Sequence, residues 1–451
     1  MLTRRAWLSA STSVLFPARA AVPARPNVLL IVADDLGYSD LSSYGCPDIR
    51  TPEIDSIGSQ GVRFTHFYAN GPECSPTRTA LLTGRYQQRV GGLECAIGVG
   101  DQGRYDEAAW LQKRGELGLP PEELTMGQVF KRAGYDTACF GKWHLGYPEK
   151  FWPHHHGFDE SFGILGGNAD YFTHKEEDGR PVLYHNGKIV ERAGYTTDLI
   201  AEAAIEWLKG RKGKPFFLYL PFTCPHTPIQ DPDGFDPAKG TAPWQNGNRK
   251  VYAKMVERMD RRVGDVLRQL DRMGAAANTI VIFISDNGGD PNGRNLPLRG
   301  RKSTTWEGGI RVPCLVRWPV GLPKGITVKQ VGITMDLLPT LLAATGAATP
   351  PGRKFDGVNL LEVMRGKQPV FARTLFWRGR RGNVVRKAVR DGDWKLVDDN
   401  GLKELHNLSV DETEQRDLLV SEPRRATELE AKLKAWEREV QSPRLRGFRA
   451  G

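Results

Sequence analysis

Residues 74–78, Cys-Ser-Pro-Thr-Arg, combine residue types that can support nucleophilic chemistry. Ser75 is typical of a helix N-cap and Gly84 of a helix end, so the stretch predicts a short helix with Cys74 just before it. First-turn N–H groups and the helix dipole favour an anion at that position, and Arg78 lies one turn further on. Cys74 is therefore either a nucleophile in positive surroundings or a buried structural cysteine.

Hard oxygen ligands follow two apolar runs that are far apart in the sequence. The first run ends in Asp34 and Asp35, and the second ends in Asp286 and Asn287. Continuous apolar runs are typical of strands that are buried on both faces of a parallel sheet. Each pair alone also fits a solvated turn. If the two strands lie side by side in one parallel sheet, however, the two pairs predict a metal site with four oxygen ligands. Such a site would lie at the carboxyl ends of the strands, at a topological switch point of the sheet.

Further polar residues lie beyond predicted strands or in a basic segment. Lys142 and His144 follow the strand predicted at 135–140, and in an extended segment both side chains project to the same side. His226 lies just beyond the next apolar strand, and Lys302 lies in a segment rich in arginine and glycine. A lone histidine is more often structural, so these residues indicate a site only when taken together.

Residues 74–85, which continue as Thr-Ala-Leu-Leu-Thr-Gly-Arg, resemble the signature of the formylglycine-dependent (type I) sulfatases. Gly-Lys-Trp-His-Leu-Gly at 141–146 resembles a second motif of that family, and the segments around His226 and Lys302 resemble a third and a fourth. The arginine and serine that flank Lys302 depart from the pattern, because small residues are common there. Within the family, the chain resembles the group of arylsulfatase A and N-acetylgalactosamine-6-sulfatase.

The resemblance implies a set of site residues at the positions that match these motifs. Cys74 is expected to be oxidised to formylglycine by the formylglycine-generating enzyme, and the hydrate of this aldehyde is the expected nucleophile. The expected cofactor is calcium, with magnesium as the second choice. The implied metal ligands are Asp34, Asp35, Cys74, Asp286 and Asn287. The implied catalytic residues are Cys74, Arg78, Lys142, His144, His226 and Lys302.

The mechanism that the resemblance implies divides these roles by charge. Arg78, Lys142 and Lys302, together with the metal, offset the negative charge on the sulfuryl oxygens. His226 with Lys302 assists the departing alcohol. His144 takes a proton from the second hydroxyl of the aldehyde hydrate, which expels sulfate without attack of water at sulfur.

The resemblance further implies an α/β fold of the alkaline phosphatase type, with a mixed, largely parallel sheet flanked by helices and a smaller C-terminal antiparallel sheet plus helix. We expect a catalytic domain at 23–350 and a C-terminal subdomain at 351–451. Sequence patterns predict elements that fit this fold. The predicted strands are 28–32, 62–68, 135–140, 215–222, 279–285, 387–390, 394–397 and 404–407. Predicted helices start at 52 and span 126–133, 196–209, 249–273, 335–345 and 424–440.

Composition and the N-terminus predict an exported, basic globular protein. The 451 residues carry a net charge of +10, which favours a polyanion such as nucleic acid, an anionic membrane or a sulfated polysaccharide. No nucleic-acid-binding motif is present, and the arginine-rich run 378–390 is typical of a solvated face. Residues 1–22, with Arg4, Arg5 and an Ala-Arg-Ala cleavage site, resemble a twin-arginine export signal, which predicts a periplasmic or secreted protein without membrane contact after cleavage.

The function predicted from these residues is hydrolysis of sulfate monoesters, on sulfated glycans or on a small aryl sulfate. One alternative is a phosphomonoesterase, phosphodiesterase or phosphonate hydrolase of the same superfamily, because such an enzyme shares the metal cage. A second alternative is a protein that binds sulfated glycans without cleaving them. The six cysteines indicate no disulfide framework. The sequence names neither the sugar, the position of the sulfate nor the oligomeric state.

Overall fold

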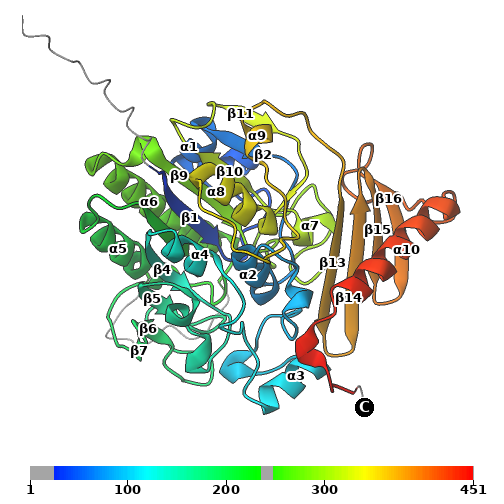
Figure 1. The fold of residues 1–451 in the computed structure, drawn as a ribbon, viewed down its shortest axis with the longest axis horizontal. Helices are drawn as coiled ribbons and strands as arrows, with labels where there is room; N and C mark the ends of the chain where they lie inside the picture. Colours follow the sequence, from blue (N-terminus) through cyan, green and yellow to red (C-terminus); the bar gives the residue numbers. More distant parts are fainter. Residues whose placement is uncertain (1–24, 235–246, 450–451) are drawn as a thin grey trace, which may run out of the picture.

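The computed structural model describes residues 25–234 and 247–449, and its centre is a ten-stranded mixed sheet (Figure 1). The strand order is β11-β2-β10-β9-β1-β8-β4-β5-β6-β7. In chain order, the strands are β1 Asn27–Ala33, β2 Val62–Phe64, β4 Asp136–Lys142, β5 Glu160–Ile164, β6 Leu183–His185, β7 Lys188–Ile189, β8 Phe216–Pro221, β9 Thr279–Ser285, β10 Cys314–Arg317 and β11 Ile326–Val328. The central strands β9, β1, β8, β4 and β5 all run parallel. The predicted fold class is confirmed.

Two hydrophobic cores sandwich this sheet because its central strands are apolar on both faces. In β1, Val28, Leu30 and Val32 enter one core, whereas Leu29 and Ile31 enter the other. Helices cover both faces (Figure 1). The first core includes residues of α2 Cys74–Thr83, α4 Met126–Arg132 and α8 Leu337–Thr345. The second includes residues of α1 Pro52–Ser59, α5 Thr196–Lys209 and α6 Arg249–Arg272. The carboxyl ends of the central strands are left to carry polar residues.

A separate four-stranded antiparallel sheet forms the C-terminal part of the molecule (Figure 1). Its strands are β13 Thr374–Arg381, β14 Val384–Asp391, β15 Trp394–Asp399 and β16 Leu402–Asn407. The helix α10 Pro423–Glu439 buries Leu429, Leu433 and Trp436 in a third core, which this sheet shares. The remaining short elements are β3 Phe67–Tyr68, β12 Gly332–Ile333, α3 Asp106–Lys113, α7 Glu307–Ile310 and α9 Leu361–Met364.

The prediction that the arginine-rich run 378–390 forms a solvated face is wrong. This run forms the hairpin of β13 and β14, and the hairpin contacts the larger sheet unit. Arg378 donates to the buried carboxylate of Glu94 at 2.6 Å, and Arg390 is buried against the hydroxyl of Tyr68. The arginines therefore hold the two parts of the molecule together.

Three further features of the sequence are the predicted export signal, membrane-crossing segments and the cysteines. The predicted export signal, residues 1–22, lies outside the described residues. No helix within 25–234 or 247–449 combines the length and hydropathy of a membrane-crossing segment. All six cysteines have free thiols.

Candidate active site

The helix α2 starts at Cys74 and places this residue in its first turn. The predicted end is confirmed, because Gly84 follows the helix in the left-handed conformation with φ of 66°. The predicted N-cap at Ser75 is wrong, because Glu73 is the N-cap residue. The Ser75 hydroxyl instead donates to the carbonyl of His144 at 2.9 Å and accepts from the amide of Ile97 at 3.2 Å. Ser75 thus ties the helix to neighbouring loops.

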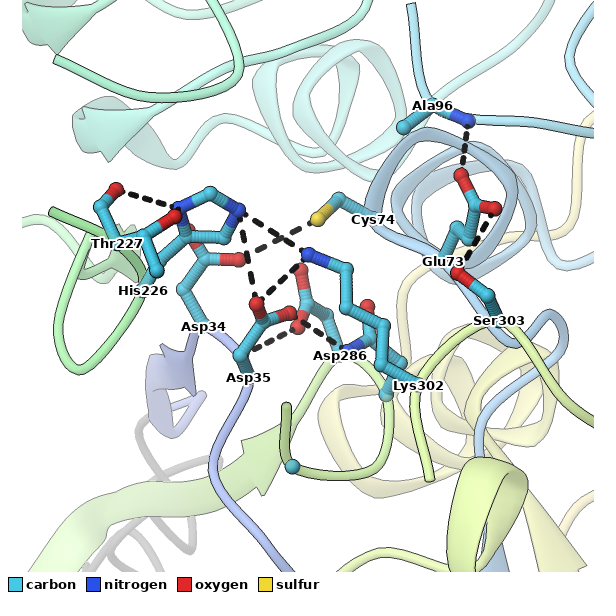
Figure 2. A network of polar contacts seen from close by, with 12 residues as sticks. Asp34, Asp35, Glu73, Cys74, Ala96, His226, Thr227, Asp286, Lys302 and Ser303 are labelled. Atoms are coloured by element: carbon cyan, nitrogen blue, oxygen red, sulfur yellow. Dashed lines mark hydrogen bonds and ion pairs between the residues drawn. The ribbon is translucent and has the colours of Figure 1, made fainter. Parts of the chain in front are cut away.

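Two polar side chains contact the Cys74 thiol, and Figure 2 shows the contact with Asp34. Its Sγ atom lies 3.4 Å from Asp34 Oδ1 and 3.3 Å from Lys142 Nζ. Burial raises the pKa of Cys74 well above its usual range, although the nearby lysines oppose that rise. As a thiol, the residue is therefore protonated at neutral pH.

The structure brings together the two oxygen pairs that follow β1 and β9. Because Ala33 pairs with Ser285 across these parallel strands, the residues that follow lie side by side. The amide of Asp35 donates to Asp286 Oδ1 at 3.2 Å, and Asn287 Nδ2 donates to Asp35 Oδ1 at 2.7 Å. Asp34, Asp35, Asp286 and Asn287 are all buried.

Three buried or nearly buried cations offset the charge of the three aspartates. Arg78 donates twice to Asp286 Oδ2, at 2.8 and 3.0 Å. Lys142 Nζ lies 2.7 Å from Asp34 Oδ2. Lys302 Nζ likewise lies 2.6 Å from Asp35 Oδ2. Burial would raise the pKa of Asp35, but the positive charge of Lys302 holds it below its usual range.

The donor set fits a hard divalent cation. Among the described residues, Asn287 Oδ1 is buried and has no hydrogen-bond partner. Burial and the neighbouring carboxylate of Asp34 raise the pKa of Asp286 to about 6, although Arg78 opposes this rise. Ligand atoms of Asp34, Asp35, Cys74 and His226 lie within 4.8 Å of one another. An oxygen-rich cluster with an unpaired carbonyl oxygen is the environment that calcium and magnesium prefer.

Backbone carbonyls define the tautomers of the two histidines. Nε2 of His144 lies 2.8 Å from the carbonyl oxygen of Ile97 and must carry the proton, because a carbonyl can only accept. Nδ1 of His144 is buried and has no hydrogen-bond partner in the described part of the chain. His226 has the opposite tautomer, because Nδ1 lies 2.7 Å from the carbonyl oxygen of Thr227 and Nε2 lies 3.1 Å from Lys302 Nζ.

The prediction that Lys142 and His144 share one side of an extended segment is wrong. The strand β4 ends at Lys142, and His144 has a φ of 55° in the left-handed region. Asp35 and Ser303 also have positive φ, at 63° and 70°. Residues other than glycine rarely adopt this backbone conformation, and those that do often occur at functional sites. His144 therefore reaches the site through a turn of the backbone.

Two charged residues near Cys74 were missed in the sequence. Glu73 is buried directly before the cysteine, and Arg381 of β13 donates to its carboxylate at 2.8 and 3.1 Å. In the sequence, Glu73 is visible as an acidic residue directly before the Cys-Ser-Pro-Thr-Arg motif. Nothing in the sequence linked it to an arginine more than 300 residues away.

The fold and the charge arrangement around Cys74 fit a hydrolase of the class that acts on esters of tetrahedral oxyanions, because the buried cations could offset the charge of such a group. Within this class, the chain belongs to the sulfatase family, because the Sulfatase family model matches residues 26–347. The protein is therefore a sulfatase, an enzyme that hydrolyses sulfate esters.

Curated relatives and solved structures agree with this assignment. The chain is 34% identical over 380 residues to N-acetylgalactosamine-6-sulfatase of Canis lupus familiaris, which covers 80% of this chain and 70% of the relative. The crystal structure of Ps i-CgsB in complex with k-i-k-neocarrahexaose is 32% identical, with a TM-score of 0.81, and covers 92% of this chain and 93% of that chain. Phosphonate monoester hydrolase of Agrobacterium radiobacter matches with a TM-score of 0.67 at 21% identity over 92% of this chain and 96% of that chain, which shows a shared fold alone.

Proposed function

We propose that the protein removes sulfate groups from sulfated glycans and uses formylglycine derived from Cys74. The observation that carries this proposal is the position of Cys74 at the start of α2, within hydrogen-bond distance of both Asp34 and Lys142. Two similar proteins support the glycan assignment. One is named for an amino sugar sulfate, and the other is in complex with an oligosaccharide.

The modification of Cys74 explains how a buried residue of this kind serves as a nucleophile. The formylglycine-generating enzyme is the proposed partner during maturation. The intact Cys-Ser-Pro-Thr-Arg stretch supports recognition of this chain by that enzyme. A hydrated aldehyde supplies one hydroxyl for attack at sulfur and a second hydroxyl whose deprotonation releases sulfate. A serine in the same place lacks that second hydroxyl.

Calcium is the proposed cofactor, with magnesium as the second choice. Asp34, Asp35, Asp286 and Asn287, together with the modified Cys74, would hold the ion, and the unpaired Oδ1 of Asn287 supports this set. The bound cation would supply positive charge against the sulfuryl oxygens. Elemental analysis of the dialysed protein tests the choice of metal, and stoichiometric zinc without calcium or magnesium would contradict it.

The surrounding residues would bind the sulfate and move protons. Arg78 and Lys142 are buried at the site and would contribute positive charge. Lys302 Nζ, which lies 3.1 Å from the unprotonated Nε2 of His226, would supply the proton for the leaving oxygen while His226 orients it. Nδ1 of His144 has no partner among the described residues and would accept the proton from the second hydroxyl.

Peptide mass spectrometry combined with an assay of sulfate release tests this function. We expect Cys74 to carry the aldehyde or its hydrate in active enzyme, and Cys74→Ala to abolish sulfate release from defined sulfated oligosaccharides. An active preparation with Cys74 entirely unmodified would contradict the mechanism.

Preferential turnover of nitrophenyl phosphates or phosphonates would favour the phosphate or phosphonate hydrolase. Cleavage of nitrophenyl sulfate alone would favour a small aryl sulfate, and glycan binding without sulfate release would favour a non-catalytic protein.

A further inference from the structure

The carboxylate of Glu73 lies at a junction of four chain segments beside the reactive centre (Figure 2). Its Oε2 accepts from the amide of Ala96 at 2.9 Å and from the thiol of Cys95 at 3.2 Å. Its Oε1 accepts from the hydroxyl of Ser303 at 3.1 Å. Arg381 of the C-terminal sheet donates to both oxygens, at 2.8 and 3.1 Å. Glu73 itself belongs to the fourth segment, which continues into α2.

Three of these segments carry or contact a group of the reactive centre, and Arg381 lies on the remaining one. The carbonyl of Glu73 accepts from the amide of Thr77 at 3.4 Å, so the residue forms part of the first turn that holds Cys74. Next to Ala96, the carbonyl of Ile97 accepts from His144 Nε2 at 2.8 Å. Ala96 and Ile97 therefore link the carboxylate of Glu73 to the ring of His144.

The third segment connects Glu73 to the Lys302 loop. Ser303 directly follows Lys302, and its amide donates to the carbonyl of Pro72 at 2.8 Å. Ser303 has a φ of 70°, a conformation that favours glycine. A serine is strained there, but it supplies the hydroxyl that glycine lacks, and this hydroxyl contacts Glu73. The loop is thus attached through its main chain to Pro72 and through its side chain to Glu73.

Glu73 can make these contacts only as a carboxylate. Burial opposes ionisation of Glu73, but the hydrogen bonds and charge of Arg381 hold its pKa below the usual range. A glutamine has one acceptor oxygen, and its amide nitrogen would face donors instead of accepting from them. We propose that Glu73 is a positioning residue that fixes Cys74, His144 and Lys302 relative to one another, and that Arg381 keeps it in place. This inference rests on the proposed function of those three residues.

A second buried glutamate provides a matched control. Glu94 is buried and accepts from Arg378 of the same strand β13 at 2.6 and 2.7 Å. This pair also connects the larger sheet unit to the C-terminal sheet. It differs from the pair of Glu73 and Arg381 because Glu94 neither precedes Cys74 nor contacts the Lys302 loop. Loss of either pair should destabilise the protein, but only one should disturb the reactive centre.

The experiment compares Glu73→Gln with Glu94→Gln in the full-length enzyme. The kcat for nitrophenyl sulfate is divided by the fraction of Cys74 converted to formylglycine, which mass spectrometry measures for each variant. A small misplacement of reacting groups can lower the rate about 10²-fold, so we expect Glu73→Gln to lower the corrected kcat by about that factor with little change in KM. Glu94→Gln should leave the corrected kcat within about twofold of wild type while lowering Tm by a similar amount.

Arg381→Gln and the double variant Glu73→Gln/Arg381→Gln separate positioning from stability. Arg381→Gln leaves a buried carboxylate unpaired, so its Tm should fall below that of the double variant, which lacks this charge. The double variant should recover Tm but not kcat. Recovery of both, or equal losses of kcat in Glu73→Gln and Glu94→Gln, would overturn the proposal.

Hydrogen exchange provides a readout that needs no activity. We expect Glu73→Gln to speed amide exchange in peptides that cover 71–80 and 300–305, and Glu94→Gln to leave both unchanged. If wild-type enzyme cleaves no sulfate ester, the proposed function fails, and this comparison still tests the junction. Unchanged exchange in Glu73→Gln would overturn the role of Glu73 in positioning these segments.

Discussion

Hydrogen bonds to backbone carbonyls leave each site histidine with one unprotonated nitrogen. In His226 this nitrogen is Nε2, which accepts from the ammonium group of Lys302. Burial and the positive charge of Lys302 lower the pKa of His226 to about 3, so the ring is neutral at neutral pH. From the sequence, His226 was the expected proton donor to the leaving group, with Lys302 assisting. The tautomer of His226 instead assigns the proton at rest to Lys302.

The first prediction concerns His226 and the leaving group. A sugar hydroxyl needs a proton as it departs, whereas nitrophenolate leaves readily as an anion. His226 orients Lys302, the proposed donor, and a positioned proton donor is typically worth about 10² to 10⁴ in rate, so His226→Ala should slow cleavage of a sulfated sugar by up to roughly that factor. Cleavage of nitrophenyl sulfate should slow much less. Steady-state kinetics with both substrates checks this, and equal losses would limit His226 to a role in sulfate binding.

The sequence predicted the residues of the site whose signal is local. Asp34 and Asp35 follow an apolar run directly, and Cys74 lies in a motif of consecutive residues. Glu73 and Arg381 escaped prediction because their contact joins segments that only the folded chain brings together. The backbone turn at His144 also escaped prediction, because a positive φ at a histidine has no clear signal in the surrounding residues.

At the scale of elements, strand prediction succeeded where side chains are apolar on both faces. The strand predicted at 279–285 matches β9, and the helix predicted at 196–209 matches α5. The strand β13 was missed because its buried residues alternate with half-buried ones, among them Arg378 and Arg380. Its apolar partners lie in the C-terminal core, whereas Glu73 and Glu94, which pair with its arginines, lie in the larger unit. Only the tertiary structure reveals both.

The helix α1 is capped by a residue of another helix. Thr51 makes no side-chain cap, whereas Asp260 of α6 accepts from the amides of Ile54 at 2.8 Å and Glu53 at 3.4 Å. Burial raises the pKa of Asp260 from 3.8 to about 7, although the bonds from these two amides oppose the rise. The contact between α1 and α6 should therefore depend on pH.

We predict that Asp260 weakens the folded state as the pH rises from about 4 to about 7. In this window the folded protein retains a proton on Asp260 that the unfolded chain has released, so the free energy of unfolding falls with increasing pH and then levels off. Asp260→Asn cannot titrate. Urea unfolding across this window should show the stability of wild type declining relative to the variant, and a constant difference would contradict the prediction.

A buried lysine attaches the C-terminal sheet to the rest of the molecule. Lys395 of β15 is fully buried, and its Nζ lies 2.8 Å from Glu307 of α7 and 2.8 Å from Glu414. Lys395→Met leaves both carboxylates buried without their ammonium partner and should lower the free energy of unfolding by about 3 to 5 kcal/mol. Chemical denaturation measures this loss.

The control for that prediction is a lysine on the neighbouring strand. Lys403 of β16 pairs with Glu430 at 3.0 Å in a partly exposed position. Lys403→Met should change stability by about 0 to 1 kcal/mol, because exposed ion pairs contribute little. Similar effects of the two substitutions would show that the buried lysine does not hold the sheet.

At the scale of the whole molecule, the N-terminal sequence predicts export by the twin-arginine route. Replacing Arg4 and Arg5 by lysine should retain the protein in the cytoplasm, because the twin-arginine route requires both arginines. Arg19→Lys alters the same leader outside that pair and should leave export unchanged. Immunoblots of cytoplasmic and exported fractions measure the outcome. Normal export of the double lysine variant would point to the general secretory route.

The burial of α2 fixes the order of events in the maturation of the enzyme. Every residue of this helix is buried, so a modifying enzyme cannot reach Cys74 once the helix has packed against the sheet. The proposed oxidation of Cys74 would therefore have to precede folding. The predicted twin-arginine route carries folded proteins, so on that route oxidation would also have to occur before the chain leaves the cytoplasm. A host that modifies proteins only outside the cytoplasm would then export a folded protein that cannot be activated.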